Sequence, residues 1–305
     1  MVNSNKKRFK HLPLYLMMVP GIIYLLINNY LPMFGLSVAF KKVNYQVGIF
    51  NSPWVGFENF EYLFKTKDAF IIFRNTICYN LVFLVFGMTF SIAIAILLSE
   101  VTSKRRLKFY QTSILIPFLL STVLVSYIVF AFLSSDSGFI NNSILKPLGI
   151  PPISWYSDPK YWPVILVVVH LWKSFGYTSI IYFATILGID SSLHEAAMVD
   201  GANMWKRIWH ITLPGLKSTI ITLALLQIGR MMYSDFGLFY QVPMNNGLLF
   251  NVTNTIDTYV YRGLLQLNDV GRSSAAGFLQ AIVGFILVLG ANLMTRKLDK
   301  DSALF

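Results

Sequence analysis

Four polar side chains interrupt one long apolar segment at positions that could do chemistry. They are His170, Lys173, Ser174 and Tyr177. Their spacing follows a helical repeat, so a helix over this segment would carry all of them on one face. A lysine at the middle of a bilayer costs about 2.5–3.5 kcal/mol on insertion scales, and Lys173 therefore needs a partner, a carbonyl group or water. Lining the path of a polar substrate is one way to provide it.

A second polar group lies near the outer end of the next apolar segment, where Gln227, Arg230 and Ser234 share a helical face. Arg230 could equally extend its side chain to the membrane interface. Sugars are bound by aromatic rings together with planar polar groups, and the candidate sugar contacts are Trp172, Tyr177, Tyr233 and Phe236. With 25 Phe, 16 Tyr and 6 Trp in the chain, however, most aromatic residues must belong to the core or to the membrane belt.

The sequence lacks the common motifs of enzymatic chemistry. It contains no G-x-x-x-x-G-K-[ST] loop, no H-E-x-x-H pair and no G-x-S-x-G turn. Its single cysteine, Cys78, excludes a disulfide framework and a thiolate metal site. We therefore predict no catalytic residue, no metal site and no cofactor bound by this chain, and any ATP must be handled by another subunit.

The composition indicates that lipid is the solvent for most of these residues. Of the 305 residues, 55% are hydrophobic and only 13% are charged, against about 25% charged in a typical globular domain. The formal net charge of +11 could point to nucleic acid, but basic residues of membrane proteins collect beside the spanning helices. We predict no nucleic-acid partner.

Six segments are long and apolar enough to cross a membrane, since a spanning helix needs about 20 residues. They cover residues 13–40, 75–99, 109–135, 161–187, 208–229 and 273–295. The first follows a basic cluster, as a signal peptide would, but it is too long and lacks a small-residue cleavage site. The predicted fold is an all-α integral membrane protein with six transmembrane helices.

The basic residues also predict the topology of the chain. They gather in the N-terminal tail, in the short loop 100–108, after the fourth segment and in the C-terminal tail, so both termini should be cytoplasmic. Lys41 and Lys42 run against this rule. In the outer loop 41–74 a near-helical spacing predicts a short helix, either in the membrane interface or packed on the bundle. Its aromatic residues are Trp54, Phe57, Phe60 and Phe64.

The loop between the fourth and fifth segments carries the most informative local pattern. Residues 194–199 are rich in good helix formers, and the hydroxyls of Ser191 and Ser192 could cap that helix. Glu195 follows Ser192 at the spacing of a capping box. Gly201 then interrupts or ends the helix. A short exposed helix of this kind is suited to docking into a groove of a partner.

These residues reproduce the signature E-A-A-x3-G-x9-I-x-L-P, and the chain thereby resembles the permease subunits of bacterial ATP-binding-cassette (ABC) importers. The matching residues are Glu195, Ala196, Ala197, Gly201, Ile211, Leu213 and Pro214. The resemblance implies that loop 190–214, with Asp200 beside Gly201, forms a coupling helix that sits in a cleft of a cytoplasmic ATPase. It also implies the type I ABC importer permease fold.

Further stretches narrow the resemblance to the binding-protein-dependent oligosaccharide and polysaccharide permeases of the maltose-type superfamily. These stretches are residues 53–60, 75–79, 171–190 and 254–262. The long outer domain of the larger maltose-type subunit is absent, so the chain is similar to the compact six-helix form. Because Trp172 and Lys173 recur in this family, a role in bracing a permease pair is an alternative to the substrate path.

The resemblance implies a set of partners and a place in the cell. The partners are a homologous second permease in a heterodimer, two cytoplasmic ATPase subunits that use ATP and Mg, and a lipid-anchored or periplasmic sugar-binding protein outside the cell. The substrate would be an oligosaccharide, such as a fragment of a plant polysaccharide or a host glycan. The expected location is the bacterial cell membrane, crossed several times by a chain that moves its substrate by alternating access.

The expected organisation has three parts, with two other functions as alternatives. Residues 1–69 hold the tail, the first helix and an outer interfacial segment, residues 70–296 the five-helix core, and residues 297–305 a cytoplasmic tail. One alternative, an ion-coupled secondary sugar carrier acting alone, would need an acid inside the membrane, and the six segments contain no Asp or Glu away from their ends. A membrane scaffold or receptor would need only the helices.

Overall fold

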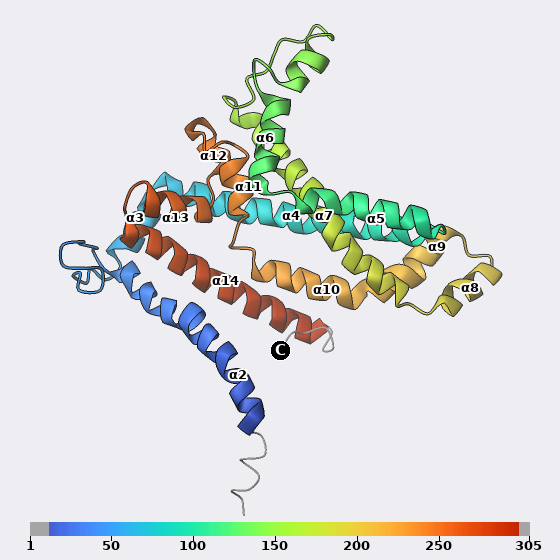
Figure 1. Cartoon of the computed structure of the whole chain (residues 1–305), viewed down its shortest axis with the longest axis horizontal. Coiled ribbons are helices and arrows are strands. Elements are labelled where there is room, and N and C mark those ends of the chain that lie inside the picture. Colours follow the sequence, from blue (N-terminus) through green and yellow to red (C-terminus); the bar gives the residue numbers. More distant parts are fainter. Residues whose placement is uncertain (1–11, 299–305) are drawn as a thin grey trace, which may run out of the picture. The chain divides into compact units, whose positions relative to one another are not determined.

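The computed structural model describes residues 12–298, which are mostly helical and form no β-strand (Figure 1). Residues 1–11, which belong to the predicted N-terminal tail, and residues 299–305 of the predicted tail 297–305 lie outside this range. The described chain forms two compact units. One contains the residues up to Thr66 together with Val260–Phe278, and the other contains Lys67–Tyr259 and the residues from Leu279 onward. The all-α prediction is confirmed, whereas the cytoplasmic location of both termini stays a prediction.

Five helical segments of the described chain are long and apolar enough to cross a membrane. They are Pro13–Phe40, Lys67–Ser99, Pro159–Leu187, Met204–Gly229 and Val270–Lys297. The first comprises α2 (Leu12–Leu25), a π-helical turn (Leu26–Tyr30) and a 3₁₀ segment (Leu31–Phe40). Each matches a predicted segment, although α4 (Lys67–Ser99) begins earlier than the predicted start at residue 75.

The segment 109–135, predicted as one helix, is instead two helices. α5 (Lys104–Leu119) and α6 (Thr122–Leu133) meet at a bend of 93° (Figure 1). Pro117 lies in the last turn of α5, and Leu120 and Ser121 both have extended backbone conformations. The hydroxyl of Ser121 then accepts a hydrogen bond from the backbone N–H of Leu124, which starts α6 with an N-cap. The residues next to the bend are mostly apolar on both sides, so a hydropathy pattern could not locate it.

The core of the larger unit forms where α4 and α5 pack against α7 (Trp162–Leu187). One cluster of buried residues includes Phe83, Trp162 and Phe239, and a second includes Tyr182 and Leu216. At Gly176 on α7, an added Cβ would lie 1.8 Å from the backbone oxygen of Ile114 on α5. Only glycine fits at this crossing.

The second half of the larger unit continues with shorter helices between the long ones. α8 (Ser191–Val199), α9 (Met204–Arg207) and a π-helical turn (Ile208–Thr212) lead into α10 (Leu213–Gly229). After α10 come α11 (Phe236–Gln241), α12 (Phe250–Thr253) and α13 (Ile256–Leu265). The long α14 (Val270–Leu298) ends the described chain and contributes residues to both units.

The smaller unit is held together by aromatic packing around the predicted short helix, α3 (Glu58–Lys65). The ring of Phe60 lies 5.2 Å from that of Phe40 and 5.8 Å from that of Phe278. The side-chain amide of Asn59 donates to the backbone oxygens of Ala39 (2.8 Å) and Lys41 (3.0 Å). Among the four aromatic residues that predicted this helix, Phe60 is buried, while Trp54, Phe57 and Phe64 are exposed. α3 therefore packs with one face and leaves aromatic side chains on the surface.

Candidate coupling loop and transport path

The predicted coupling loop begins with a capped helix. The carboxylate of Asp190 accepts a hydrogen bond from the backbone N–H of Ser192 at 2.9 Å, which makes Asp190 the N-cap of α8. The predicted serine caps, and with them the capping box between Ser192 and Glu195, are wrong. Aspartate caps helices as well as serine does, so the residue type already carried this signal. The hydrogen bonds from Ser192 hold the pKa of Asp190 below its ordinary value.

The same helix ends in a Schellman motif at the predicted glycine. The backbone N–H of Ala202 donates to the oxygen of Ala197 (2.8 Å), and that of Gly201 donates to the oxygen of Met198 (3.1 Å). Gly201 has φ +75°, and an added Cβ would meet no atom within 4 Å. The position therefore requires glycine for its backbone conformation rather than for space. The predicted end of the helix at Gly201 is confirmed.

α8 carries no buried residue and presents apolar side chains to its surroundings. Leu193, Met198 and Val199 are exposed, the last of them to 88%. Beyond the turn, Trp205 and Trp209 are exposed as well. Exposed apolar patches of this kind mark surfaces that another molecule covers.

The two halves of the signature have different surroundings. Glu195, Ala196, Ala197, Asp200 and Gly201 lie on α8 and at its end. Ile211, Leu213 and Pro214 lie where the π-helical turn passes into α10, next to the buried residues Thr212 and Leu216. Pro214 is the second residue of α10, which directly follows the π-helical turn, so it lies inside the continuous helical segment Met204–Gly229. The half of the signature on α8 thus lies on an exposed surface, and the half from Ile211 to Pro214 is anchored in a spanning helix.

An ion pair connects this loop to the end of α4. The guanidinium of Arg207, at the end of α9, lies 3.8 Å from the carboxylate of Glu100. The Arg207 side chain is only 17% exposed, and its Nε has no hydrogen-bond partner in the described chain. From the sequence, Arg207 is only one of the basic residues after the fourth segment that predict a cytoplasmic loop. Its role in linking α9 to α4 depends on a contact that no local pattern encodes.

The predicted polar face of α7 is directed into the protein for most of its length. Lys173 Nζ donates to the hydroxyl of Thr122 at 2.6 Å, directly after the bend between α5 and α6. The ring of His170 stacks on that of Phe83, with centroids 3.7 Å apart. These contacts favour bracing between helices for Lys173 and His170. Tyr177 is half exposed and stacks on Phe118, so it remains accessible to a substrate.

The other candidate path residues lie on the surface of the larger unit. Arg230 ends α10 and is exposed, as are Tyr233 and Trp172. Phe236, the first residue of α11, stacks on Tyr240 with centroids 4.9 Å apart. Asp235, which the sequence left in an outer loop, lies close enough to His170 for an electrostatic interaction.

A buried polar network in α4 is not among the features predicted from the sequence. The side-chain amide of Asn75 donates to the backbone oxygens of Asn251 (3.1 Å) and Asn254 (2.9 Å). The hydroxyl of Thr76 accepts from the N–H of Ile256, and that of Tyr79 donates to the oxygen of Val252. Residues 75–79 and 254–262, two of the stretches that carried the resemblance, meet here. Polar residues repeated at helical spacing in an apolar span were the available signal.

The same region contains an acid that the sequence placed in a loop. Asp257 accepts hydrogen bonds from the backbone N–H (2.6 Å) and hydroxyl (2.8 Å) of Ser234 through one oxygen. Its other oxygen accepts from the amide of Gln280 (3.1 Å), which also donates to the backbone oxygen of Met232. Both carboxylate oxygens are therefore engaged, and this arrangement fits a structural acid better than an ion carrier.

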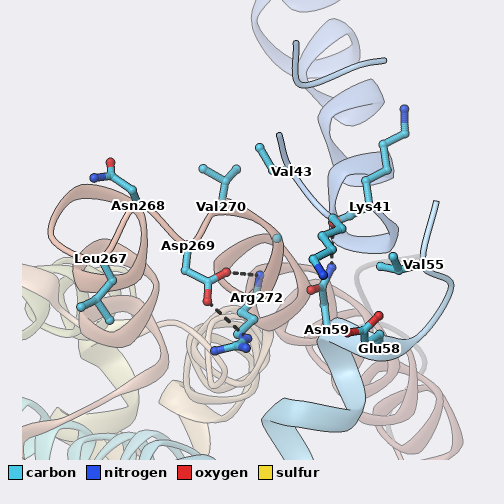
Figure 2. Close-up of a pocket in the computed structure, with 12 residues that line it drawn as sticks. Lys41, Val43, Val55, Glu58, Asn59, Leu267, Asn268, Asp269, Val270 and Arg272 are labelled. Atoms are coloured by element: carbon cyan, nitrogen blue, oxygen red, sulfur yellow. Dashed lines mark hydrogen bonds and ion pairs between the residues drawn. The ribbon is translucent and has the colours of Figure 1, made fainter. Parts of the chain in front are cut away.

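A polar hollow of 320 Å³ lies in the smaller unit (Figure 2). Its lining includes Lys41, Glu58, Asn59, Asp269 and Arg272. Asp269 and Arg272 form an ion pair with each other at 3.3 Å. Because acids and bases both line the hollow, it has no field of a single sign that would select a charged ligand.

Comparison with known proteins places this geometry in a family. Residues 87–301 match the family described as binding-protein-dependent transport system inner membrane component. Protein LplB of Bacillus subtilis is 37% identical over 288 residues, which cover 94% of this chain and 90% of that protein. The polygalacturonan/rhamnogalacturonan transport system permease protein YteP of the same organism is 36% identical over 293 residues, covering 94% and 89%.

Solved structures agree with these sequence matches. A chain of a bacterial ABC transporter involved in the import of the acidic polysaccharide alginate superposes with a TM-score of 0.88 and 33% identity, covering 96% of this chain and 98% of that one. A second structure, of the alginate transporter in complex with a periplasmic protein that carries alginate pentasaccharide, gives a TM-score of 0.87.

Proposed function

This chain belongs to the family of binding-protein-dependent transport system inner membrane components, and from this premise we propose that its loop 190–214 couples a cytoplasmic ATPase to sugar import. The chain is a multi-pass membrane protein and the permease component of an ABC importer for oligosaccharides or polysaccharides. The observation that carries the coupling role is α8, which is capped at both ends, has no buried residue and exposes the apolar side chains of Leu193, Met198 and Val199.

The proposed partners follow from the family and from the surfaces of this chain. Two ATPase subunits, which use ATP and Mg, would receive α8 and the exposed Trp205 and Trp209. A second, similar permease would complete the pore as a heterodimer. An extracellular sugar-binding protein would deliver the substrate, which is supported by the related alginate transporter in complex with such a protein.

Movement would pass from the ATPase to the membrane through α8 and its connections. The Asp190 cap and the Schellman motif at Gly201 fix the length and direction of α8, so a partner that moves it moves a rigid element. From there the Arg207–Glu100 pair leads to α4, and the π-helical turn leads to α10. Closure of the ATPase would thereby turn the bundle from inward-open to outward-open.

The proposed substrates are oligosaccharide fragments of plant polysaccharides or host glycans. Half-exposed aromatic rings at Tyr177 and Tyr233, together with Trp172, Phe236 and Arg230, would contact the sugar. Two similar proteins are described as transporters of polysaccharides. One belongs to a polygalacturonan/rhamnogalacturonan transport system, and the other takes part in the import of the acidic polysaccharide alginate. A screen should therefore include uronate-containing oligosaccharides beside neutral ones.

Gly201→Arg tests the coupling role, and Gly149→Arg is its matched control. Gly149 also has a positive φ (+70°) and no atom within 4 Å of an added Cβ, but it lies in the segment between α6 and α7. Both variants carry the same charge and the same backbone strain. We expect Gly201→Arg to abolish ATP-driven oligosaccharide uptake in proteoliposomes and to weaken co-purification of the ATPase, whereas Gly149→Arg retains both.

Equal uptake by the two variants would contradict the coupling role. Uptake by the isolated chain, driven by a proton or sodium gradient without ATP, would instead support the secondary carrier.

A further inference from the structure

A groove of 310 Å³ opens on the larger unit between α4, α7 and α12. It is lined by Arg74, Asn75, Cys78, Tyr79, Val82, Pro163, Val167, Asn251 and Val252. Ile77 and Leu81 on α4 and Val164 on α7 are exposed beside it. The groove therefore lies on an apolar surface of two membrane-spanning helices.

The groove is polar at one end and apolar along its floor. Arg74 and Asn251 lie at the polar end, whereas Cys78 and Val82 follow one and two turns further along α4. The distance from Arg74 to Val82 along the helix is about 12 Å, from a rise of roughly 1.5 Å per residue. On α7, the floor likewise continues from Pro163 to Val167. The polarity of the groove thus changes along the helix axes.

Arg74 carries an uncompensated charge at this end. Its Nε and one Nη donate to the side-chain oxygen of Asn75 (3.2 and 3.0 Å), and that Nη also donates to the backbone oxygen of Asn251 (2.5 Å). Its guanidinium also lies over the ring of Phe70. These partners are neutral, and no carboxylate of the described residues pairs with Arg74. The other Nη of Arg74 keeps two N–H groups that can donate to an acceptor of a bound molecule.

Aromatic residues mark the level of this end in the membrane. Two residues before Pro163, the ring of Tyr161 packs against that of Trp155, with centroids 5.0 Å apart, and lies under the Lys160 ammonium. Tyrosine and tryptophan concentrate where the hydrocarbon meets the headgroups. Arg74 and Asn251 therefore lie near the headgroup level, and Cys78, Val82 and Val167 lie deeper.

We propose that this groove binds one anionic phospholipid, with its phosphate on Arg74 and an acyl chain over Cys78, Val82 and Val167. The lipid belongs to the leaflet at the N-terminal ends of α4 and α7, the outer leaflet in the predicted topology. A free guanidinium N–H pair matches a phosphate, and the net negative charge of an anionic lipid, which zwitterionic phosphatidylcholine lacks, complements the unpaired charge of Arg74. A floor without polar partners fits an acyl chain and does not fit a sugar.

The single cysteine of the chain is a natural reporter of this site, because Cys78 lines the groove and is exposed. The full chain, purified with its partner subunits, is placed in nanodiscs of phosphatidylcholine alone or mixed equally with phosphatidylglycerol. The rate of maleimide labelling at Cys78 is then measured. We expect phosphatidylglycerol to slow labelling about fivefold, an effect of the size that one basic side chain exerts on anionic lipid.

Two variants assign the effect to Arg74. Arg74→Gln should remove the dependence on phosphatidylglycerol, whereas Lys160→Gln, which changes a basic residue outside the groove, should retain it. If maleimide labels Cys78 of the wild-type chain at the same rate in both lipid mixtures, that result alone overturns the proposal. Protection by inorganic phosphate in detergent would mean a site for free anions, and labelling that appears only after removal of the second permease would mean a protein contact.

Discussion

The coupling loop and the polar network of α4 satisfy their hydrogen bonds in opposite ways. α8 closes both of its ends with residues of its own loop, Asp190 at the start and the backbone around Gly201 at the end. Asn75 instead pairs with backbone oxygens 176 and 179 positions away in the sequence. The helix ends of the first region are closed within one loop, whereas the second region forms only when the whole unit folds.

This difference suits two mechanical roles. An element whose hydrogen bonds are internal can move as a rigid piece without losing them, as a transmitter between two proteins must. A network that joins distant segments fixes their relative positions, and it cannot open without leaving buried polar groups unpaired. Changes in the loop should therefore impair transport with little effect on stability, and changes in the network should do the reverse.

The largest effect on stability is expected for Asn75→Ala. The change removes the buried amide donor from the backbone oxygen of Asn254, whereas that of Asn251 keeps its bond from Arg74, and a buried acceptor that loses its donor costs about 1–3 kcal/mol. We expect a clearly lower melting temperature of the purified complex in detergent, measured by fluorescence-detected gel filtration after heating.

Thr89→Ala is the control for Asn75→Ala in the same helix. The hydroxyl of Thr89 is exposed and bonds only to Val85 within α4. Its removal should leave the melting temperature nearly unchanged. A similar loss of stability in the two variants would mean that the network does not anchor α12 and α13.

The next effect concerns coupling rather than stability. Arg207→Gln removes the pair with Glu100, and because Glu100 is 41% exposed the pair is worth at most about 1 kcal/mol. We expect more ATP hydrolysed per sugar imported, by up to about fivefold, with little change in melting temperature. The ratio is measured in proteoliposomes with radiolabelled oligosaccharide.

Arg105→Gln, an exposed basic residue of α5, is the control for this measurement and should leave the ratio unchanged. The exchange Glu100→Arg with Arg207→Glu should restore part of the coupling. If neither arginine variant differs from the wild-type chain, α9 does not transmit movement to α4.

The same contrast explains how far the sequence could predict the structure. The five spans and the end of α8 at Gly201 depend on composition and on neighbours within a few residues. The sequence therefore predicts them correctly. The bend after Pro117 was missed because the residues on both sides of it are mostly apolar and proline also occurs inside transmembrane helices. The Asp190 cap was misassigned among adjacent residues that cap equally well.

Contacts between distant residues account for the other omissions. Asp235, Asp257 and Arg207 looked like ordinary charged residues of loops and flanks. The partners of Asp257 and Arg207, respectively Ser234 and Glu100, are set by the packing of distant segments of the chain. A lysine in a span called for a partner, but only the fold identifies it as Thr122 beside the bend.

The smallest effect is a pH dependence at the start of α8. Hydrogen bonds from Ser192 lower the pKa of Asp190 in the folded chain, so its ionised form is favoured by folding. This stabilisation is complete above the ordinary pKa of aspartate, about 3.9, and is lost as the pH falls through the lower pKa of the folded state. Asp190 therefore stays ionised at neutral pH, and coupling through α8 should not change with pH in that range through titration of this residue.

Amide hydrogen exchange over residues 191–199 tests this expectation. Asp190→Ala should speed exchange in the first turn of α8 at neutral pH, because one backbone N–H loses its acceptor. Asp190→Asn should exchange like the wild-type chain, since asparagine caps equally well without a titrating group. Unchanged exchange in Asp190→Ala would show that α8 keeps its start without the cap, and the loop would then depend on its partner ATPase for rigidity.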